Sequence, residues 1–339
     1  MNFKLPVSST ESFDLTQRPR RNRISESIRG LVRETRLHPG NFVLPLFIQE
    51  NSGSTPIHSM PGQFRLGPDA LLKEAADAFA RGIRAVALFP VISENLKDPK
   101  ASESKNPKGL LPRTIGILKE NLPALTVITD VAMDPYSSDG HDGLVEQGKI
   151  LNDETLPVLA EMALVQARAG ADIIAPSDMM DGRIGYLRKA LDENDLRDVG
   201  ILSYAVKYAS AFYGPFRDAL DSAPKSGDKK TYQMDPANVR EAAREVELDV
   251  REGADMVMVK PALPYLDVIA HVRSLVPVPV AAYQVSGEYA MIKAAAKQGW
   301  LEEKKAVLET LTSIKRAGAD IIFTYFAKDA AAWLVRSQD

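Results

Sequence analysis

The stretch ADMVMVKPALPYLD, residues 254–267, decides the fold class of this chain. Four apolar residues, 256–259, run without interruption into Lys260, and Pro261 ends the run. A strand that is apolar throughout is typical of a parallel sheet covered on both faces. Because proline favours an extended residue before it and offers no ladder donor, Lys260 is predicted at the carboxyl end of the strand. In α/β barrels this end carries the chemistry.

Similar apolar runs recur along the chain and alternate with segments of helical period. The eight predicted strands are 42–48, 84–89, 126–131, 171–175, 200–205, 254–259, 278–283 and 319–324. The clearest predicted helices are 69–81, 156–169, 238–251 and 302–316. Several strands follow similar turns, RGIRA, RAGAD, REGAD and KRAGAD, in which a basic residue and a glycine end a helix. We therefore predict an α/β fold, a closed (β/α)8 TIM barrel. A doubly wound open sheet is the alternative, but no glycine-rich phosphate loop follows the first strand.

Composition narrows the class of protein. With 45% hydrophobic and 26% charged residues in 339, the chain has enough apolar material for a large core. A net charge of −3 favours neither nucleic acid nor an anionic membrane as partner. No apolar run reaches the ~18 residues of a membrane span, and the N-terminus lacks the apolar core of a secretory signal. We therefore expect a soluble cytoplasmic protein. The absence of cysteine excludes disulfides, thiolate nucleophiles and cysteine zinc sites.

Two segments stand apart from the predicted barrel, which spans residues 31–339. Residues 1–30 are polar and basic, and they form either a solvated tail or an N-terminal arm that embraces a neighbouring subunit. Residues 214–238 have weak periodicity, which in a compact domain is typical of an active-site lid or of disorder. This segment carries Arg217, Lys225, Lys229, Lys230 and Gln233, so it could either meet a carboxylate substrate or be a solvated charged loop.

A second lysine strengthens the prediction of an active site. Lys207 ends the run before that of Lys260, so neighbouring strands would bring the two amines together. Burial and a second ammonium both disfavour the charged form, which is one route to a nucleophilic amine. Two such amines can each form an imine with a ketone. The competing interpretation is a pair of surface lysines that cap strands.

Acidic residues crowd the segments that follow the third and fourth predicted strands. Residues 130–143 contain Asp130, Asp134, Asp139, His141 and Asp142. Oxygen donors at this density suit a hard cation such as Mg²⁺, but Asp-Pro and Asp-Gly are also ordinary turn sequences. Asp178 and Asp181 could supply a general base or cap the next helix. The other histidines, His38, His58 and His271, stand alone and are interpreted as surface or satisfied residues.

Six motifs in this order resemble the porphobilinogen synthase (5-aminolevulinate dehydratase) family. They are APSDMMDGR, KYASAFYGPFRDA, TYQMDPAN, MVMVKP, YQVSGEYAM and KRAGADIIFTYFAK, and the resemblance runs from about Arg18 to the end. It implies a (β/α)8 barrel with an N-terminal arm, usually assembled as an octamer. It also implies condensation of two 5-aminolevulinate molecules to porphobilinogen, with loss of two waters, in haem and chlorophyll biosynthesis.

The resemblance also assigns site residues. It implies that Lys207 and Lys260 form Schiff bases, the second being the one most firmly tied to turnover. One substrate carboxylate would meet Arg217, Lys229 and Gln233, and the other Ser286 and Tyr325. Tyr213 and Phe216 would line the pocket, and Asp130 and Ser177 would lie near a substrate amine.

One departure from the family concerns metal. Many members hold zinc with three cysteines where this chain has Ala132, Asp134 and Asp142. Oxygen donors disfavour zinc, and the chain resembles the branch stimulated by Mg²⁺ bound near a subunit interface. In that branch the matching ligand is Glu245, and whether Asp134 or Asp142 binds a cation stays open. No organic cofactor is implied.

Two other functions are compatible with the lysines alone. A class I aldolase-like barrel would need a single imine, so only one lysine would be essential. A non-enzymatic barrel that binds or scaffolds would have no need of both lysines and the segment 214–238.

Overall fold

The computed structural model describes residues 15–222 and 224–335, which form two compact units divided between Arg36 and Leu37. The first unit contains η1 (Pro19–Arg23) and α1 (Glu26–Leu31), and neither element buries a residue. The Ser25 hydroxyl caps α1 by accepting the backbone N–H of Ile28. The role of residues 1–30 as an arm for a neighbouring subunit stays a prediction, and residues 1–14 lie outside the described part.

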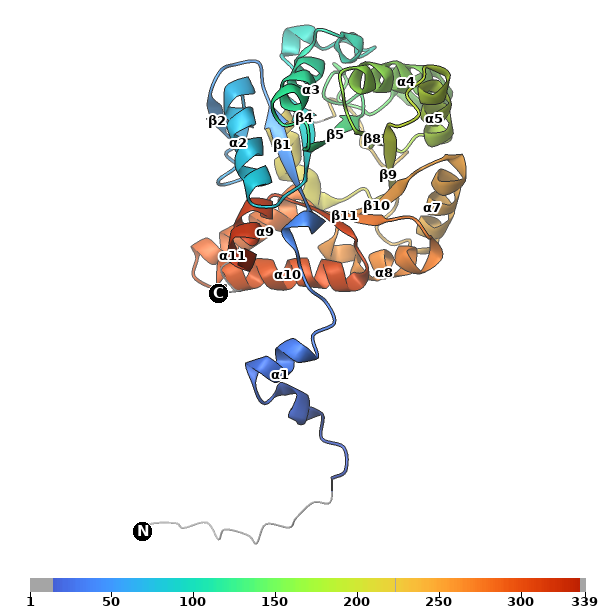
Figure 1. The fold of residues 1–339 in the computed structure, drawn as a ribbon. Helices are drawn as coiled ribbons and strands as arrows, with labels where there is room; N and C mark the ends of the chain where they lie inside the picture. Colours follow the sequence, from blue (N-terminus) through green and yellow to red (C-terminus); the bar gives the residue numbers. More distant parts are fainter. Residues whose placement is uncertain (1–14, 223, 336–339) are drawn as a thin grey trace, which may run out of the picture. The chain divides into compact units, whose positions relative to one another are not determined.

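The second unit is the predicted closed barrel of parallel strands (Figure 1). Its strands, in order around the barrel, are β1 (Phe42–Ile48), β4 (Ala85–Pro90), β5 (Thr126–Val131), β8 (Ile173–Pro176), β9 (Gly200–Lys207), β10 (Met256–Lys260), β11 (Val280–Gln284) and β12 (Ile321–Thr324). Pairing of Phe42 with Ile322, and of Val43 with Phe323, joins the last strand to the first. This closure confirms the (β/α)8 barrel and rules out the open sheet.

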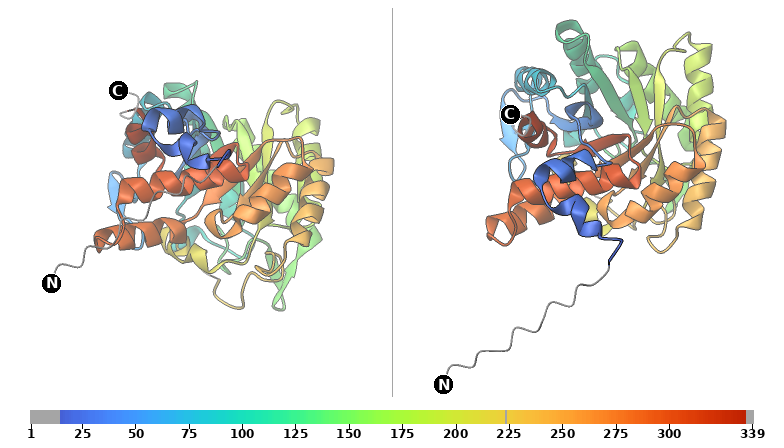
Figure 2. Two further views of the ribbon diagram at one scale, coloured as in Figure 1. Left: turned by 90° about the horizontal axis from the view of Figure 1, so that it is seen from below. Right: turned by 60° about the horizontal axis from the view of Figure 1, so that its bottom comes forward.

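Helices surround the strands, as Figure 2 shows from two further sides. They are α2 (Pro68–Ala80), α3 (Leu110–Asn121), α4 (Asn152–Arg168), α5 (Arg183–Glu193), α7 (Arg240–Glu252), α8 (Leu266–Leu275), α9 (Ser286–Lys297), α10 (Glu303–Ala317) and α11 (Ala327–Val335). Two of the predicted glycine stops are confirmed. Gly253 and Gly318 follow α7 and α10 with φ of 109° and 121°, a conformation that glycine adopts readily. None of the helices in the described part is long and apolar enough to cross a membrane.

Short elements decorate the barrel and were not predicted. A hairpin of β2 (Ser54–Pro56) and β3 (Phe64–Leu66) joins β1, and β6 (Leu144–Glu146) pairs with β7 (Lys149–Leu151). The segment 214–238 begins with α6 (Gly214–Leu220), just after η5 (Ala211–Tyr213). The remaining 3-10 turns are η2 (Pro39–Asn41), η3 (Glu94–Leu96), η4 (Ser102–Lys105) and η6 (Leu263–Tyr265).

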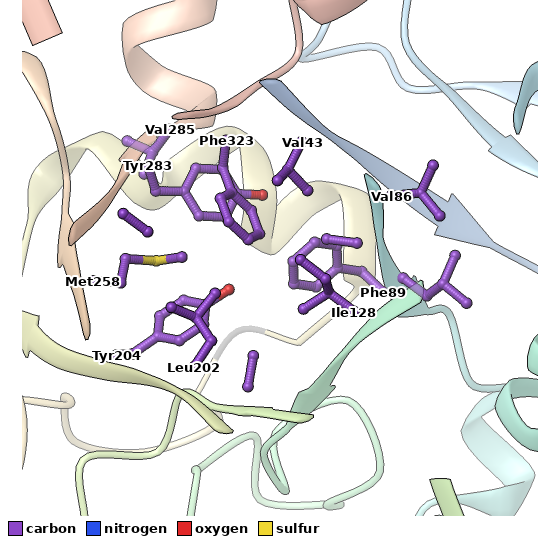
Figure 3. Packing of buried hydrophobic residues seen from close by; sticks show 14 of the residues in the cluster. Val43, Val86, Phe89, Ile128, Leu202, Tyr204, Met258, Tyr283, Val285 and Phe323 are labelled. Carbon is purple, nitrogen blue, oxygen red and sulfur yellow. The ribbon is translucent and has the colours of Figure 1, made fainter. Parts of the chain in front are cut away.

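Side chains fill the barrel interior, so it is a packed core (Figure 3). Val43, Ile128, Leu202, Met258 and Phe323 lie among buried apolar neighbours. Towards the carboxyl ends of the strands the filling becomes aromatic: the ring of Phe89 lies 5.2 Å from that of Phe216 and 6.4 Å from that of Tyr283. This aromatic layer forms the floor of the site described next.

At the amino ends of the strands, aspartates from the repeated turns that end helices hydrogen-bond to the neighbouring strands. Each aspartate stands just before or beside the start of a strand and accepts a backbone N–H from the neighbouring strand. The pairs are Val127 N–H to Asp172 (2.8 Å), Ile201 N–H to Asp255 (2.7 Å) and Val280 N–H to Asp320 (3.2 Å). The same turn sequence thus ends a helix and fixes the register of two strands.

Candidate active site

Lys260 and Lys207 stand side by side at the carboxyl ends of β10 and β9. The two residues are register partners, after an irregularity in the ladder between Val257 and Val259. Each side chain is buried, with only 6% of the residue exposed. Burial, reinforced by the neighbouring Lys207, lowers the pKa of Lys260 to about 7. The predicted pair of neighbouring amines is therefore present in the fold, and about half of the Lys260 amine is uncharged at neutral pH.

Aromatic rings enclose the Lys260 amine. Its Nζ lies 4.7 Å from the ring centre of Tyr283, 5.0 Å from that of Tyr204, 5.1 Å from that of Phe216 and 5.3 Å from that of Tyr213. The Tyr213 hydroxyl also donates a hydrogen bond to the Lys260 carbonyl, at 3.1 Å. Ring faces attract a cation, so they favour a charged nitrogen that burial alone would exclude.

The Lys207 amine has polar neighbours instead. Its Nζ donates a hydrogen bond to the carbonyl of Ser177 and lies 3.8 Å from a carboxylate oxygen of Asp142. The two amines therefore differ in kind, since one is surrounded by rings and the other by oxygen atoms.

Asp130 lies near the end of β5, and its carboxyl group interacts electrostatically with both amines. Burial, and then the nearby Asp134, raise the pKa of Asp130 to about 7, against the opposing effect of Lys207 and Lys260. The nearby Ser177 side chain also opposes this rise in pKa, and Oδ1 of Asp130 has no hydrogen-bond partner among the described residues. A buried carboxyl group that titrates near neutral pH can exchange protons with a reacting molecule.

Lys229 occupies the space between two carboxylates of the acidic segment. Its ammonium lies 3.1 Å from Asp134 and 3.2 Å from Asp142, and all three side chains are buried. Burial opposes the charge on Lys229, yet the two carboxylates hold its pKa above the usual value. The part of the chain that the structure describes contains no cluster of three or more metal-binding side chains. In this structure Asp134 and Asp142 pair with a lysine, and whether either also binds a cation stays a prediction.

The segment 214–238 covers the amines and leaves very little space beneath it. The cavity lined by Lys207, Lys260, Arg217, Lys229 and Gln233, together with Asp134, Tyr213 and Phe216, holds about 30 Å³. This is about a tenth or less of the ~300–1,000 Å³ of a typical ligand pocket. Ligand binding therefore requires the covering segment to move.

Two residues that were predicted to bind a substrate carboxylate lack a polar partner at this cavity. The Arg217 guanidinium is half-buried and has no ion pair with any residue that the structure describes. Gln233 is buried, and within the described residues its Oε1 has no hydrogen-bond partner. Polar groups that lack partners in a closed site are suited to meet a polar ligand.

Ser286 and Tyr325 lie on the far side of the aromatic rings. The Ser286 hydroxyl accepts the Phe216 N–H at 3.0 Å, and the Tyr325 hydroxyl lies 3.0 Å from that of Tyr283. The rings of Phe216 and Tyr283 in turn lie 5.1 and 4.7 Å from the Lys260 Nζ. The structure thus links Ser286 and Tyr325 to residues whose rings surround the Lys260 amine, whereas Lys229 and Lys207 both approach Asp142.

Other sequence-predicted residues lie apart from the amines. Glu245, on α7, is half-buried beside a groove of 1110 Å³, which Glu241 and Asp181 also line. Burial and Asp249 raise the pKa of Glu245 to about 6. Asp178 accepts the N–H of Met180 at 2.7 Å, so it closes its own turn.

Sequence reasoning missed three features of the site. Tyr204 and Tyr283 complete the rings around Lys260, and their positions inside strands near the carboxyl ends were the available signal. His141 is buried and fastens the covering segment, with Nδ1 3.2 Å from the Tyr232 hydroxyl and Nε2 2.9 Å from the Ser226 carbonyl. Nothing local in the sequence indicates these long-range partners.

The fold and site define an α/β-barrel enzyme whose buried amines stand at the carboxyl ends of neighbouring strands. The family model for delta-aminolevulinic acid dehydratase matches residues 16–333, and the chain belongs to this family.

Known relatives agree with this assignment. The chain is 58% identical over 319 residues to the chloroplastic delta-aminolevulinic acid dehydratase of Physcomitrium patens, covering 94% of this chain and 74% of that protein. It is 55% identical over 332 residues to the chloroplastic protein of Chlamydomonas reinhardtii, covering 95% of this chain and 85% of that one. A similar solved structure is delta-aminolevulinic acid dehydratase (porphobilinogen synthase) from Toxoplasma gondii, in complex with the reaction product porphobilinogen. It has a TM-score of 0.94 and 55% identity, over 95% of this chain and 93% of that one.

The relatives correct one expectation. A cytoplasmic location was expected because the N-terminus lacks an apolar secretory core, but these curated relatives are named chloroplastic. The expectation was wrong because plastid-targeting segments are polar, so the absence of an apolar core does not distinguish plastid from cytoplasm.

Proposed function

We propose that this chain condenses two molecules of 5-aminolevulinate to porphobilinogen through imines on Lys260 and Lys207. The observation that carries the proposal is the register pairing of two buried lysines at the carboxyl ends of adjacent strands. Each amine can attack one ketone and release one water. Two substrates fixed on neighbouring strands then react at high effective concentration. Family membership and the product named for the Toxoplasma gondii structure support the reaction.

The two amines have different parts in this proposal. Lys260, with its pKa lowered to about 7, supplies a neutral nucleophile, and its rings favour the cationic imine that results. An imine acidifies the adjacent carbon, so loss of a proton gives an enamine that can attack the other substrate. Asp130, with a pKa of about 7 and a place near both amines, is suited to accept that proton.

Carboxylate recognition divides in the same way. Arg217, Lys229 and Gln233, which line the cavity together with both amines, would receive the carboxylate of the substrate on Lys207. Ser286 and Tyr325, whose hydroxyls bond Phe216 and Tyr283, would receive the other carboxylate. Tyr213 and Phe216 line the cavity between them. Closure of the segment 214–238 would exclude water from the reacting groups.

Borohydride trapping tests the assignment. Reduction in the presence of 5-aminolevulinate should add substrate-derived mass to the peptides of Lys260 and Lys207, as located by mass spectrometry. Lys293, which is ion-paired with Glu303, is an internal control and should stay unmodified. An unmodified Lys260 peptide would refute the assignment. If Lys207→Ala kept near-full activity while Lys260→Ala was inactive, the single-imine, aldolase-like mechanism would replace it.

A separate proposal concerns magnesium. Mg²⁺ favours oxygen ligands and keeps several waters, so it can be held by one or two carboxylates. Glu245 offers one carboxylate for such an ion, Glu241 and Asp181 line the same groove without clustering around it, and the chain has no cysteine for zinc. When bound there, the ion would supply positive charge away from the amines and so act on conformation. Treatment with EDTA followed by Mg²⁺ should change activity or assembly size in the wild type but not in Glu245→Gln. Unchanged values in both proteins would contradict the assignment.

Assembly and location complete the proposal. We propose a homo-octamer in which residues 1–30 contact a neighbouring subunit, supported by helices that bury no residue of their own. Light scattering of the full chain and of a form lacking residues 1–30 would test it, and an unchanged mass would contradict it. We also propose a plastid location, on the strength of the chloroplastic relatives. Imaging of the native protein in the source cells would test this location.

A further inference from the structure

Glu288 carries a buried carboxylate, and its hydrogen-bond donors among the described residues are all backbone N–H groups. It is completely buried in the first turn of α9. It accepts three backbone N–H groups, those of Leu263 (2.6 Å), Val285 (2.6 Å) and Ala262 (3.4 Å). None of the ion pairs in the described part of the chain includes Glu288. A carboxylate that is buried without a cation is costly, and burial raises the pKa of Glu288 to about 7 despite the three donors.

The three donors belong to two different segments. Val285 lies at the start of α9, where a glutamate in the first turn often reaches back to the backbone. Ala262 and Leu263 belong to the loop that leaves β10 just after Lys260. Glu288 therefore ties the loop after the Lys260 amine to the helix that begins with Ser286.

A third segment joins the same group of contacts. The Ser286 hydroxyl accepts the Phe216 N–H at 3.0 Å and donates to the Phe212 carbonyl at 3.4 Å. A Cβ atom at Gly287 would lie 2.5 Å from that same carbonyl, so the helix and η5 are in the closest contact that a glycine allows. The Tyr213 hydroxyl then donates to the Lys260 carbonyl and completes a closed ring of contacts.

We propose that Glu288 is a positioning residue, which holds the Lys260 amine and the Ser286 hydroxyl at a fixed separation. This inference rests on the proposed function, because it concerns the same imine. Glu288 touches no substrate atom in this account. It acts through backbone hydrogen bonds to the loop after Lys260 and to the start of α9.

An ordinary helix cap would not need this arrangement. At the start of α4, Asp153 and Glu154 place carboxylates in the first turn while remaining exposed to water. They complement the helix dipole without the cost of burial. Glu288 accepts that cost and gains two hydrogen bonds beyond its own helix. The extra contacts connect groups that would bind the two ends of one substrate, so their loss should affect catalysis as well as stability.

Substitution of Glu288 by glutamine tests the proposal. The glutamine side chain would keep the shape but only one acceptor oxygen, because its NH2 group would face backbone donors. In Glu288→Gln we expect kcat and the rate of borohydride trapping at Lys260 to fall together, by about tenfold to a hundredfold for a displacement near 1 Å. KM should rise as well, because Ser286 moves with α9. Asp255→Asn is the matched control, since Asp255 accepts the Ile201 N–H at the other end of the barrel. It should leave kcat, KM and trapping unchanged.

The outcomes distinguish a failure of the proposed function from a failure of the role proposed for Glu288. Absence of a Lys260 adduct in the wild type would refute the proposed function itself. If the wild type is trapped but Glu288→Gln shows only a lower Tm, with kcat, KM and trapping rate of the wild type, Glu288 is a structural cap and this inference is wrong. Glu288→Asp decides the matter if the glutamine variant does not fold, because it keeps the charge but is too short to reach Leu263. Slower trapping in a folded Glu288→Asp supports the inference, and wild-type trapping overturns it.

Discussion

The amine of Lys260 is subject to two opposing influences from its surroundings. Burial and the neighbouring Lys207 favour the neutral amine, whereas the four ring faces favour positive charge. Burial, reinforced by Lys207, lowers the pKa of Lys260 to about 7 against the opposing effect of nearby aspartates. A site built in this way can release the proton of its ammonium and still accept the cation of an imine.

The first residue-scale prediction concerns pH. Because the pKa of Lys260 is lowered to about 7, the neutral fraction should increase as pH rises from about 6 to about 8. The rate of borohydride trapping at Lys260 should increase with it, with a midpoint near the same pKa. In Lys207→Met the neighbouring charge is removed, so the pKa should rise and the midpoint should move to higher pH. A midpoint that stays in place would show that Lys207 does not act on Lys260.

A second prediction isolates the ring faces. Tyr283→Phe keeps the ring 4.7 Å from Nζ, whereas Tyr283→Leu removes it. A cation–π contact of about 0.5–2 kcal/mol corresponds to a change of about threefold to thirtyfold in the equilibrium for the cationic imine. The leucine variant should therefore show less trapped adduct at equilibrium and a lower Lys260 pKa. If leucine instead raised that pKa, the ring would be acting only by excluding water.

At this scale the sequence predicts some residues and not others. Lys207 and Lys260 could be predicted because each ends an apolar run, and strand order made them neighbours. The partners of Lys229 could not, because Asp134 and Asp142 are 95 and 87 residues away along the chain. The acidic segment was interpreted as a cation site or a turn, and in the structure it receives the ammonium of Lys229 from the covering segment.

At the scale of the element, the aspartates at the strand starts make a specific prediction. Asp255→Ala removes the acceptor of the Ile201 N–H, which then lacks its 2.7 Å partner. A lost hydrogen bond of this kind lowers the free energy of unfolding by about 1–2 kcal/mol. Chemical denaturation should show this loss, while kcat stays at the wild-type value because the aspartate is at the far end of β10. A loss of activity without a loss of stability would contradict the assignment.

The long elements were predictable and the short ones were not. Eight strands and the main helices follow from periodicity and from glycine stops, and their ends differ from the prediction by a few residues at most. The hairpin strands β2, β3, β6 and β7 have three residues each, too few to show an alternating pattern. Helix α6 was missed for a similar reason, since its seven residues begin with glycine and proline.

At the scale of the whole barrel, closure over the site depends on Lys229. In Lys229→Met the carboxylates of Asp134 and Asp142 would be buried without their cation, and breaking such a pair costs about 3–5 kcal/mol. The segment 214–238 should open more often, so limited proteolysis within it should become faster and KM should rise. Adding Asp134→Asn removes one of the stranded charges. The double variant should recover resistance to proteolysis but not KM. Equal proteolysis of Lys229→Met and wild type would contradict this role.

The ion pairs of Lys229 also affect how strongly a charged ligand can bind. In the structure the ammonium already has two carboxyl neighbours, Asp134 at 3.1 Å and Asp142 at 3.2 Å. An incoming carboxylate would therefore compete with Asp134 and Asp142 for this ammonium. Much of the electrostatic gain from binding the carboxylate is thereby cancelled. Selectivity among keto acids should then depend on how well the rest of the ligand fits the site. Tightness of binding should accordingly depend only weakly on ionic strength, even though the ligand is charged.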